Sequence, residues 1–319
     1  MGSPIIARSL AELRSPAPKN SAVTLGVFDG VHLGHREIIR ELIHVRNRKS
    51  VDGCYLITFD PHPVVVTHSR MTPPMLTTID ERLALLGSFD LDGIVVLEFN
   101  RELADLDYRS FIENYLLKPF DMKVLVLGYD CYFGKNREGS PEKAGEEGVR
   151  LGYETTVVPA LQQGNAVVSS TKIRNALMKG DVAGANELLG HPYLLTGTVV
   201  RGHGKGHELG FPTANLAVPD AHKLWPPRGV YAVKVEYRGQ TLHGMMNVGS
   251  APTIKALGDG VCEAEVHLFE FEGDLYGERL DVYCCAYLRE ERRFPSPGAL
   301  VEQLEADRLE AIAQLAKHT

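Results

Sequence analysis

Short apolar runs and amphipathic stretches alternate along the first half of the chain. Residues 22–28, 53–59, 93–99, 124–128 and 153–159 are apolar runs of strand length. Apolar residues recur at helical spacing in residues 34–48, 79–89 and 108–117. Because strands that alternate with helices are joined by crossover connections, this pattern predicts a parallel sheet flanked by helices. Such a sheet binds its ligand at the carboxyl ends of the strands.

The pattern changes near Gly190. The second half carries alternating, glycine-punctuated segments at 194–200, 229–237, 241–248, 262–271 and 279–288. Short strands at close spacing, separated by turn residues, indicate an antiparallel β-barrel. We expect a terminal helix over 298–317, a short connecting helix over 181–189, and two domains, 1–185 and 186–319.

The composition agrees with two globular domains and argues against some classes of function. The chain has 319 residues, 44% hydrophobic and 24% charged, with a net charge of −7. An acidic balance argues against nucleic-acid binding, and no apolar run approaches the length of a membrane span. The start of the sequence lacks the pattern of a secretory signal. Five cysteines without a CxxC spacing make zinc or disulfides improbable, so we expect a cytoplasmic protein that is a monomer or a weak homo-oligomer.

The sharpest local signal is TLGVFDGVHLGHREII at residues 24–39. An apolar strand ends in a glycine turn, and His32, Gly34 and His35 open the following helix. A helix N-terminus offers free N–H groups and a positive dipole end, which suit a triphosphate. The two histidines could donate hydrogen bonds to a leaving pyrophosphate, and Gly34 would let the nucleotide approach the backbone. The alternative is a pair of helix-start histidines without a ligand.

The segment GVFDGVHLGH resembles the nucleotidyltransferase signature of bifunctional riboflavin kinase/FAD synthetases. Three later stretches are similar to further motifs of that family: TFDPHP (58–63), LGYDCYFGKNREG (127–139) and VSSTKIR (168–174). The resemblance implies a Rossmann-like FMN adenylyltransferase domain in the first half. It also implies nucleotide or flavin contacts from Gly26, Phe28, Asp29, Gly34, Asp60, His62, Asp130, Ser170 and Thr171.

Each of these contacts also has an ordinary structural explanation. His62 could be a turn histidine between two prolines, and Ser170 and Thr171 could simply cap a helix. Arg174, one turn further on, is placed by the resemblance where a guanidinium could clamp phosphate oxygens. The sequence departs from the family at Cys131, where Phe is usual, and at Lys172, where Arg is usual.

The second half begins with GTVVRGHGKGHELGFPTAN at residues 197–215. Its glycine-rich stretch could cover the phosphates of a nucleotide, and it is not a Walker-type loop. The closing PTAN resembles the riboflavin kinase motif, which implies Mg²⁺ held by Thr213 and Asn215, both hard oxygen donors. The residues assigned to nucleotide binding here are Gly202, Gly204, Lys205 and Gly206. A glycine-rich hairpin with a polar tip is the alternative.

Further matches follow at NVGSAPT (247–253), EVHL (265–268) and LREERRF (288–294). The family implies that Glu265 is the general base that takes the proton of the riboflavin 5′-hydroxyl. Asn247 is expected at the nucleotide, and Arg289 at phosphate or flavin, although Arg289 could equally form a surface salt bridge. His207 and Ala251 stand where the family commonly has Arg.

The resemblance therefore implies an enzyme that phosphorylates riboflavin to FMN with MgATP and adenylylates FMN to FAD, releasing pyrophosphate. Its catalytic residues would be His32, His35, Arg174 and Glu265. Two alternatives stay open: a riboflavin kinase with a decayed transferase domain, and a flavin-binding regulator without turnover. A cytidylyl- or pantetheine-directed transferase would share the two histidines but leaves the PTAN half unexplained.

Overall fold

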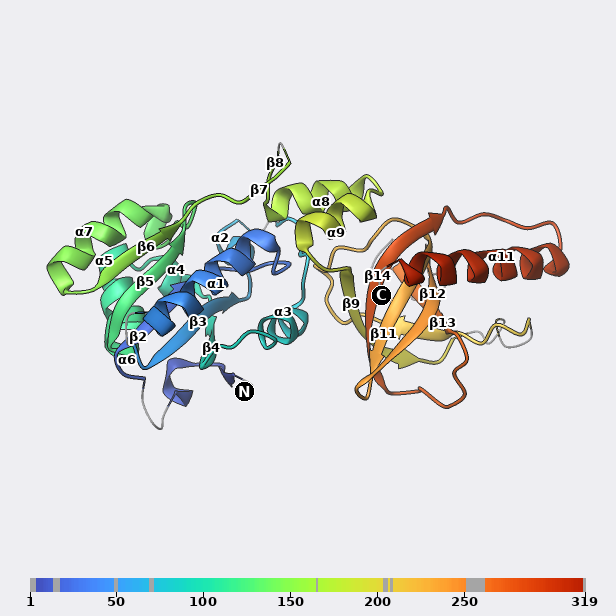
Figure 1. Cartoon of the computed structure of the whole chain (residues 1–319), viewed down its shortest axis with the longest axis horizontal. Coiled ribbons are helices and arrows are strands. Elements are labelled where there is room, and N and C mark those ends of the chain that lie inside the picture. The colour runs from blue at the N-terminus through green and yellow to red at the C-terminus, as the bar shows by residue number, and fades with distance from the viewer. Residues whose placement is uncertain are drawn as a thin grey trace. The chain divides into compact units, whose positions relative to one another are not determined.

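The computed structural model describes residues 4–13, 18–48, 51–68, 72–164, 166–202, 206, 209–250 and 262–317 (Figure 1). The chain forms two compact units. The first unit comprises Met1–Pro73 and Arg82–Ser169, and the second comprises Pro74–Glu81 and Ser170–Thr319. Gly204, Lys205, His207 and Ala251 lie outside the described residues.

The first unit is built on one parallel sheet, as the sequence predicts. Its strand order is β1-β4-β3-β2-β5-β6, and every neighbouring pair is parallel. The strands are β1 (Ile5–Ala7), β2 (Ser21–Leu25), β3 (Gly53–Asp60), β4 (Gly93–Glu98), β5 (Met122–Gly128) and β6 (Glu154–Val158). The three-residue strand β1 was not predicted, because it is too short to show a pattern. A small antiparallel pair consists of β7 (Gln162–Gln163) and β8 (Ala166–Val167).

Helix α1 (Leu33–Arg48) packs across β2, β3, β5 and β6 (Figure 1). Ile39, Leu42 and Val45 bury one stripe of this helix, at the spacing that an amphipathic helix presents to a sheet. The predicted helix at 108–117 becomes the short α5 followed by the π-helical segment η3. The other helical elements are η1 (Leu10–Glu12), α2 (Pro63–Thr67), α3 (Ile79–Leu86), α4 (Arg101–Ala104), α5 (Tyr108–Phe111), η3 (Ile112–Leu117), α6 (Lys118–Phe120), η4 (Lys135–Arg137) and α7 (Pro141–Leu151).

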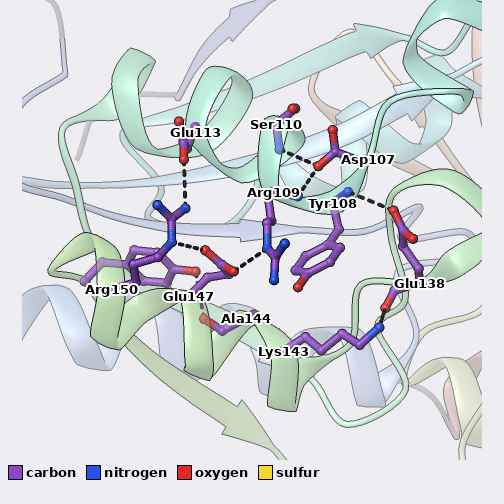
Figure 2. Close-up of polar contacts among 11 residues, drawn as sticks. Asp107, Tyr108, Arg109, Ser110, Glu113, Glu138, Lys143, Ala144, Glu147 and Arg150 are labelled. Carbon is purple, nitrogen blue, oxygen red and sulfur yellow. Dashed lines mark hydrogen bonds and ion pairs between the residues drawn. The ribbon is translucent and has the colours of Figure 1, made fainter.

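An ion-pair network fastens α7 to α5 and η3. Figure 2 shows the Glu147 carboxylate between two guanidinium groups, with Arg109 Nε and Arg150 Nε each 2.7 Å from a carboxylate oxygen. Arg150 also reaches Glu113 at 2.9 Å. Burial alone would raise the pKa of Glu147, but the hydrogen bonds from Arg150 and Arg109 outweigh it and lower that pKa. The charged form of Glu147 therefore stabilises this corner of the unit.

The chain order across the sheet creates a switch point beside β2. From β2 the chain proceeds through β3 to β4 on one side, and then returns to place β5 on the other side of β2. Open parallel sheets bind ligands outside the carboxyl ends of the strands at such a point. The segments that leave β2 and β5 there begin at Gly26 and Tyr129.

The second unit contains a closed antiparallel barrel, which confirms the predicted architecture. The strand order is β10-β13-β12-β11-β14-β9, and β9 pairs with β10 to close the barrel. The strands are β9 (Tyr193–Val200), β10 (Ala214–Ala217), β11 (Gly229–Tyr237), β12 (Gln240–Ser250), β13 (Cys262–Leu268) and β14 (Arg279–Arg289). Strand β10 was not predicted, because its residues end the glycine-rich stretch that was interpreted as a loop.

Helices α8 (Ser170–Met178), α9 (Val182–Leu189) and α11 (Pro297–Ala316) also belong to this unit. Helix α11 contacts β11, β12 and β14, whereas α9 contacts β9 and β14 (Figure 1). One apolar core joins the barrel interior to α8 and α9. No helix in the described part of the chain is long and apolar enough to cross a membrane.

A buried ion pair holds the segment Pro74–Glu81 in the second unit. Lys223 Nζ donates to Glu81 Oε2 and Leu76 O at 2.6 Å each and to Leu194 O at 2.7 Å. Glu81 Oε1 accepts from the Thr196 backbone N–H at 2.7 Å. Because both charged groups are fully buried and hydrogen-bonded, removing one partner would leave an uncompensated charge.

Candidate active sites

The loop between β2 and α1 has an unusual backbone. Phe28, Gly30 and Val31 adopt positive φ angles of 54°, 83° and 42°. Strand β2 therefore ends at Leu25, three residues before the predicted end, since a strand cannot continue through such angles. Positive φ at non-glycine residues costs on the order of 1–3 kcal/mol and concentrates at functional sites. Phe28 and Val31 are nearly completely buried, which holds the loop in this conformation.

At the end of this loop the two predicted histidines stack on each other. The ring centroids of His32 and His35 are 3.5 Å apart, and the ring planes differ by 15°. His32 directly precedes α1, and its Nδ1 accepts a hydrogen bond from the His35 backbone N–H at 3.2 Å. With Nδ1 acting as acceptor, the neutral His32 ring carries its proton on Nε2, which becomes a donor.

His35 stacks on His32 and is half-buried. Burial is the largest cause that lowers the pKa of His35 well below 6.5, and the charges of His32 and Arg82 lower it further. His35 is therefore neutral at physiological pH. Its Nδ1 is buried and has no hydrogen-bond partner in the described part of the chain. Since buried polar atoms are nearly always satisfied, this nitrogen is a candidate contact for a bound substrate or water.

Gly34 lies close against the ring of His32. A methyl group at this position would lie 3.2 Å from His32 Cε1 and 3.8 Å from the carbonyl oxygen of Val168. The glycine thus allows the His32 ring to lie flat against the start of α1. Val168 also brings the start of the VSSTKIR motif to the loop.

Other predicted residues of the first unit lie at the carboxyl ends of neighbouring strands. Asp29 is buried in the β2–α1 loop, Asp60 ends β3, and Asp130 is exposed just after β5. Because β3, β2 and β5 are adjacent and parallel, these residues lie along one edge of the sheet. His62 directly precedes α2, and its Nδ1 accepts from the Val64 N–H at 3.1 Å. His62 therefore caps this short helix, whereas the alternative left by the sequence was a turn histidine between two prolines.

Ser170, Thr171 and Arg174 lie on α8, in the second unit. The Arg174 side chain is largely buried, and its Nε donates to the Pro74 carbonyl oxygen at 2.8 Å. The structure thus groups this motif with the segment 74–81. The predicted phosphate contacts of these three residues stay a prediction.

In the second unit, three predicted residues form a row across the barrel. Glu265 on β13 is paired with Asn215 on β10 and with Asn247 on β12. All three are half-buried, whereas their neighbours Ala264 and Val266 point into the core. Because side chains alternate along a strand, the row lies on the outer face of the barrel. A carboxylate and two amides are thereby aligned side by side.

Two glycines approach this row closely. A methyl group at Gly202 would lie 2.1 Å from Asn215 Nδ2, and one at Gly206 would lie 3.2 Å from Thr213 Oγ1. The missing side chains let the backbone pack directly against the two candidate metal ligands, Thr213 and Asn215. No group of three His, Cys, Asp or Glu side chains suited to a metal occurs in the described residues. The hydroxyl and amide oxygens fit Mg²⁺, which needs few protein ligands when phosphate and water complete its shell.

Arg289 is engaged in an ion pair, the alternative that the sequence left open. Its Nε and Nη2 donate to Asp307 Oδ1 and Oδ2 at 2.8 and 2.6 Å, and Asp307 is 1% exposed. The guanidinium lies 5.7 Å from the ring centroid of Phe294. Phe294 lines a cavity of about 420 Å³ between residues 292–295 and α11.

Sequence reasoning missed four buried charged residues, namely Arg82, the paired Lys223 and Glu81, and Asp307. Arg82 is 2% exposed, and its Nη1 donates to Thr58 Oγ1 at 3.2 Å and to the Phe59 carbonyl oxygen at 3.0 Å. Charged residues are usually exposed, so a local pattern assigns them to the surface. Nothing in the sequence around these residues indicated their partners.

Two family models match the chain, one in each half. The FAD synthetase model matches residues 14–172, and the riboflavin kinase model matches residues 189–315. A bifunctional riboflavin kinase/FMN adenylyltransferase of Listeria monocytogenes is 34% identical over 299 residues, which cover 93% of both chains. The protein of the same name from Escherichia coli is 35% identical and covers 93% of this chain and 94% of the relative.

One solved structure covers almost the whole chain. The crystal structure of a protein named macrolide-efflux protein, from Streptococcus pneumoniae, superposes with a TM-score of 0.81 at 31% identity. It covers 96% of this chain and 98% of that one. The two-unit architecture is therefore shared along the full length.

Proposed function

Because the chain belongs to the family of bifunctional riboflavin kinase/FMN adenylyltransferases, we propose that the residues described above form one active site for each activity. The enzyme phosphorylates riboflavin to FMN with ATP and adenylylates FMN to FAD. The observation that carries this function is the presence of both family matches, one in each half. We place the division of the catalytic domains at 185/186, in the interval that neither model covers.

In the adenylyltransferase site, a phosphate oxygen of FMN attacks the α-phosphorus of ATP. The bond from that phosphorus to the α,β-bridging oxygen breaks, and pyrophosphate leaves. We assign hydrogen bonding to the leaving pyrophosphate to His32 and His35. The support is their stacking at the positive end of α1 and the hydrogen bond that orients the His32 ring. A charge on His32 disfavours a second charge on the stacked His35 ring, and burial of His35 disfavours it further.

The remaining contacts of this site are proposed from their places in the sheet. Gly26, Phe28 and Asp29 build the strained loop, while Asp60, His62 and Asp130 follow the adjacent strands. We propose that they contact nucleotide or flavin. For Ser170, Thr171 and Arg174 of α8 we propose a phosphate contact from the VSSTKIR motif alone. His62 acts there while capping α2.

In the kinase site, the riboflavin 5′-hydroxyl oxygen attacks the γ-phosphorus of ATP. The bond to the β,γ-bridging oxygen breaks, and ADP leaves. Glu265 takes the hydroxyl proton, because its carboxylate lies in the same row as Asn215 and Asn247. When bound by Thr213 and Asn215, Mg²⁺ would supply positive charge against the phosphates of ATP. The backbone at Gly202 and Gly206 packs closely against Asn215 and Thr213. We propose a phosphate-covering role for these two glycines and for Gly204 and Lys205.

The flavin end of the kinase site is proposed at the cavity beside Phe294. Arg289 does not contact the flavin directly in this proposal, because two of its nitrogens already donate hydrogen bonds to Asp307. The ion pair fixes the Arg289 side chain beside the Phe294 ring. Arg289 is therefore proposed as a support of the flavin site in place of a phosphate ligand.

The rival with a decayed transferase domain is not favoured. It rested on two departures, Cys131 and Lys172. Cys131 packs with the first-unit core, and its Sγ donates to the Leu25 carbonyl oxygen at 3.7 Å. Burial, followed by the charge of Asp130, raises the pKa of Cys131 to about 12, so the thiol is unreactive. Efflux is not proposed either, because the family models and the curated relatives agree on the two flavin activities.

Product analysis tests this function. The protein is incubated with riboflavin, ATP and Mg²⁺, and FMN, FAD, ADP and pyrophosphate are quantified over time. The proposal predicts FMN first and FAD later, with one ADP per flavin phosphorylated and one pyrophosphate per FAD. FMN without FAD would support the single-activity rival, and no product above the enzyme-free control would support the regulator.

A further inference from the structure

Arg82 forms a buried connection from α3 to the loop that carries the histidine pair. Its Nη1 donates to Thr58 Oγ1 at 3.2 Å. The Thr58 hydroxyl has one proton, and it donates that proton to the Val27 carbonyl oxygen at 3.0 Å. The direction of both bonds is therefore fixed, from Arg82 through Thr58 to Val27. All three residues belong to the first unit.

The hydrogen bond to Val27 can hold the strained loop, because Val27 directly precedes the first residue with a positive φ angle. The next residue, Phe28, has a φ of 54°, and the loop ends at His32. Such a backbone persists only where its surroundings fix it. Arg82 also donates to the Phe59 carbonyl oxygen at 3.0 Å, which anchors the guanidinium to β3. The loop is thus tied to the sheet by a bond from a rigid, buried group.

The charge of Arg82 also acts on His35. The titratable groups that influence the His35 ring are His32 from the loop and Arg82 from α3, and the Phe28 ring packs edge-on at 5.2 Å. Both groups, together with burial, lower the pKa of His35. Because the guanidinium of Arg82 stays protonated, it lowers the pKa of His35 over the whole physiological pH range.

We propose that Arg82 is a positioning residue for adenylyl transfer, which holds the His32–His35 pair in place through Thr58 and Val27. This inference rests on the role proposed above for the histidine pair. Arg82 does not touch the reacting atoms: it sets the place of groups that do. Since a displacement of about 1 Å can cost on the order of 100-fold in rate, a loosened loop is sufficient to impair the reaction.

Three variants separate the effect of the hydrogen bonds of Arg82 from the effect of its charge. Arg82→Met removes the charge and the hydrogen bonds at similar length, Arg82→Lys keeps the charge, and Thr58→Val removes only the hydroxyl connection. FAD formation from supplied FMN is measured from pH 5 to 9, and the His35 ring is titrated by NMR. Kinase activity on riboflavin, which does not use this loop, is the control for the second unit, and urea unfolding of each variant is the control for folding of the first unit.

Arg82→Met is expected to lower the rate of FAD formation on the order of 10- to 100-fold and to shift the His35 titration to higher pH. Arg82→Lys is expected to restore the titration, and Thr58→Val to lower the rate without moving the titration. An Arg82→Met protein with wild-type rate and His35 titration would overturn the inference. If Arg82→Met does not fold, a wild-type rate in Thr58→Val overturns it equally well.

A failure of the proposed function can be distinguished from a failure of the inference about Arg82. If His35→Ala forms FAD at the wild-type rate, the role assigned to the histidine pair is wrong. The NMR titration of His35 in the Arg82 variants still reports whether Arg82 controls the charge of the ring.

Discussion

Glu265 stands directly opposite Asn215 across the antiparallel strands β13 and β10. The same carboxylate-bearing residue is in register with Asn247 on its other side. A shift of one residue in either strand pairing would turn the partner side chain into the barrel core. The barrel register is thus what brings the proposed base next to the proposed metal ligand.

Gly202→Ala should damage the kinase site specifically. The added methyl group would lie 2.1 Å from Asn215 Nδ2, so the amide must move away from the row. We expect FMN formation to fall by at least tenfold, while FAD formation from supplied FMN is unchanged. Gly145→Ala is the matched control, because a methyl group there meets no atom within 4 Å. Equal FMN formation by both variants would contradict the proposed crowding.

The lowered pKa of His35 predicts how the free energy of unfolding depends on pH. Burial, then His32 and Arg82, lower the pKa of folded His35 well below 6.5, so the unfolded state binds its proton first as the pH falls. The stability contributed by neutral His35 is present above pH 6.5 and is lost between 6.5 and the lower folded pKa. The slope is at most about 1.4 kcal/mol per pH unit. Urea unfolding at pH 7.5 and 5.5 should show a smaller loss for His35→Gln than for the wild type; equal losses would argue against this assignment.

Glu147→Gln should destabilise the first unit. The carboxylate is 6% exposed and accepts from both Arg109 and Arg150, although these arginines are half-exposed and screened by solvent. We expect a loss of about 1–3 kcal/mol in the free energy of unfolding. Since the pKa of Glu147 is lowered, its contribution is full above about pH 4.5 and is lost as the pH falls through the folded value. Glu146→Gln, exposed on the same helix, is the control and should change stability little.

Asp307→Asn should weaken riboflavin binding in the kinase reaction. The substitution removes the charge that fixes Arg289 and leaves a largely buried cation without its partner. We expect about 1–3 kcal/mol lower stability of the second unit and a higher KM for riboflavin, with the KM for ATP nearly unchanged. The exposed Glu305→Gln on the same helix serves as the comparison. If a folded Asp307→Asn protein has the wild-type KM for riboflavin, the proposal that Arg289 supports the flavin site is wrong.

The sequence predicted both architectures and the histidine pair, because strand, turn and helix follow one another locally around His32. It did not predict the positive φ angles of Phe28 and Val31, since bulky and β-branched residues disfavour them and only tertiary packing holds them there. Strand β10 was missed because glycines precede it and it is only four residues long. The pairing of Lys223 with Glu81 joins residues 142 positions apart, which no local pattern encodes.

The central claim is that one chain carries two separate active sites. The most direct test is a comparison of Glu265→Gln with the wild type on two substrates, riboflavin and FMN, each with MgATP. The account predicts that Glu265→Gln forms no FMN from riboflavin above background and converts supplied FMN to FAD at the wild-type rate. Loss of both reactions in a folded Glu265→Gln protein would contradict it.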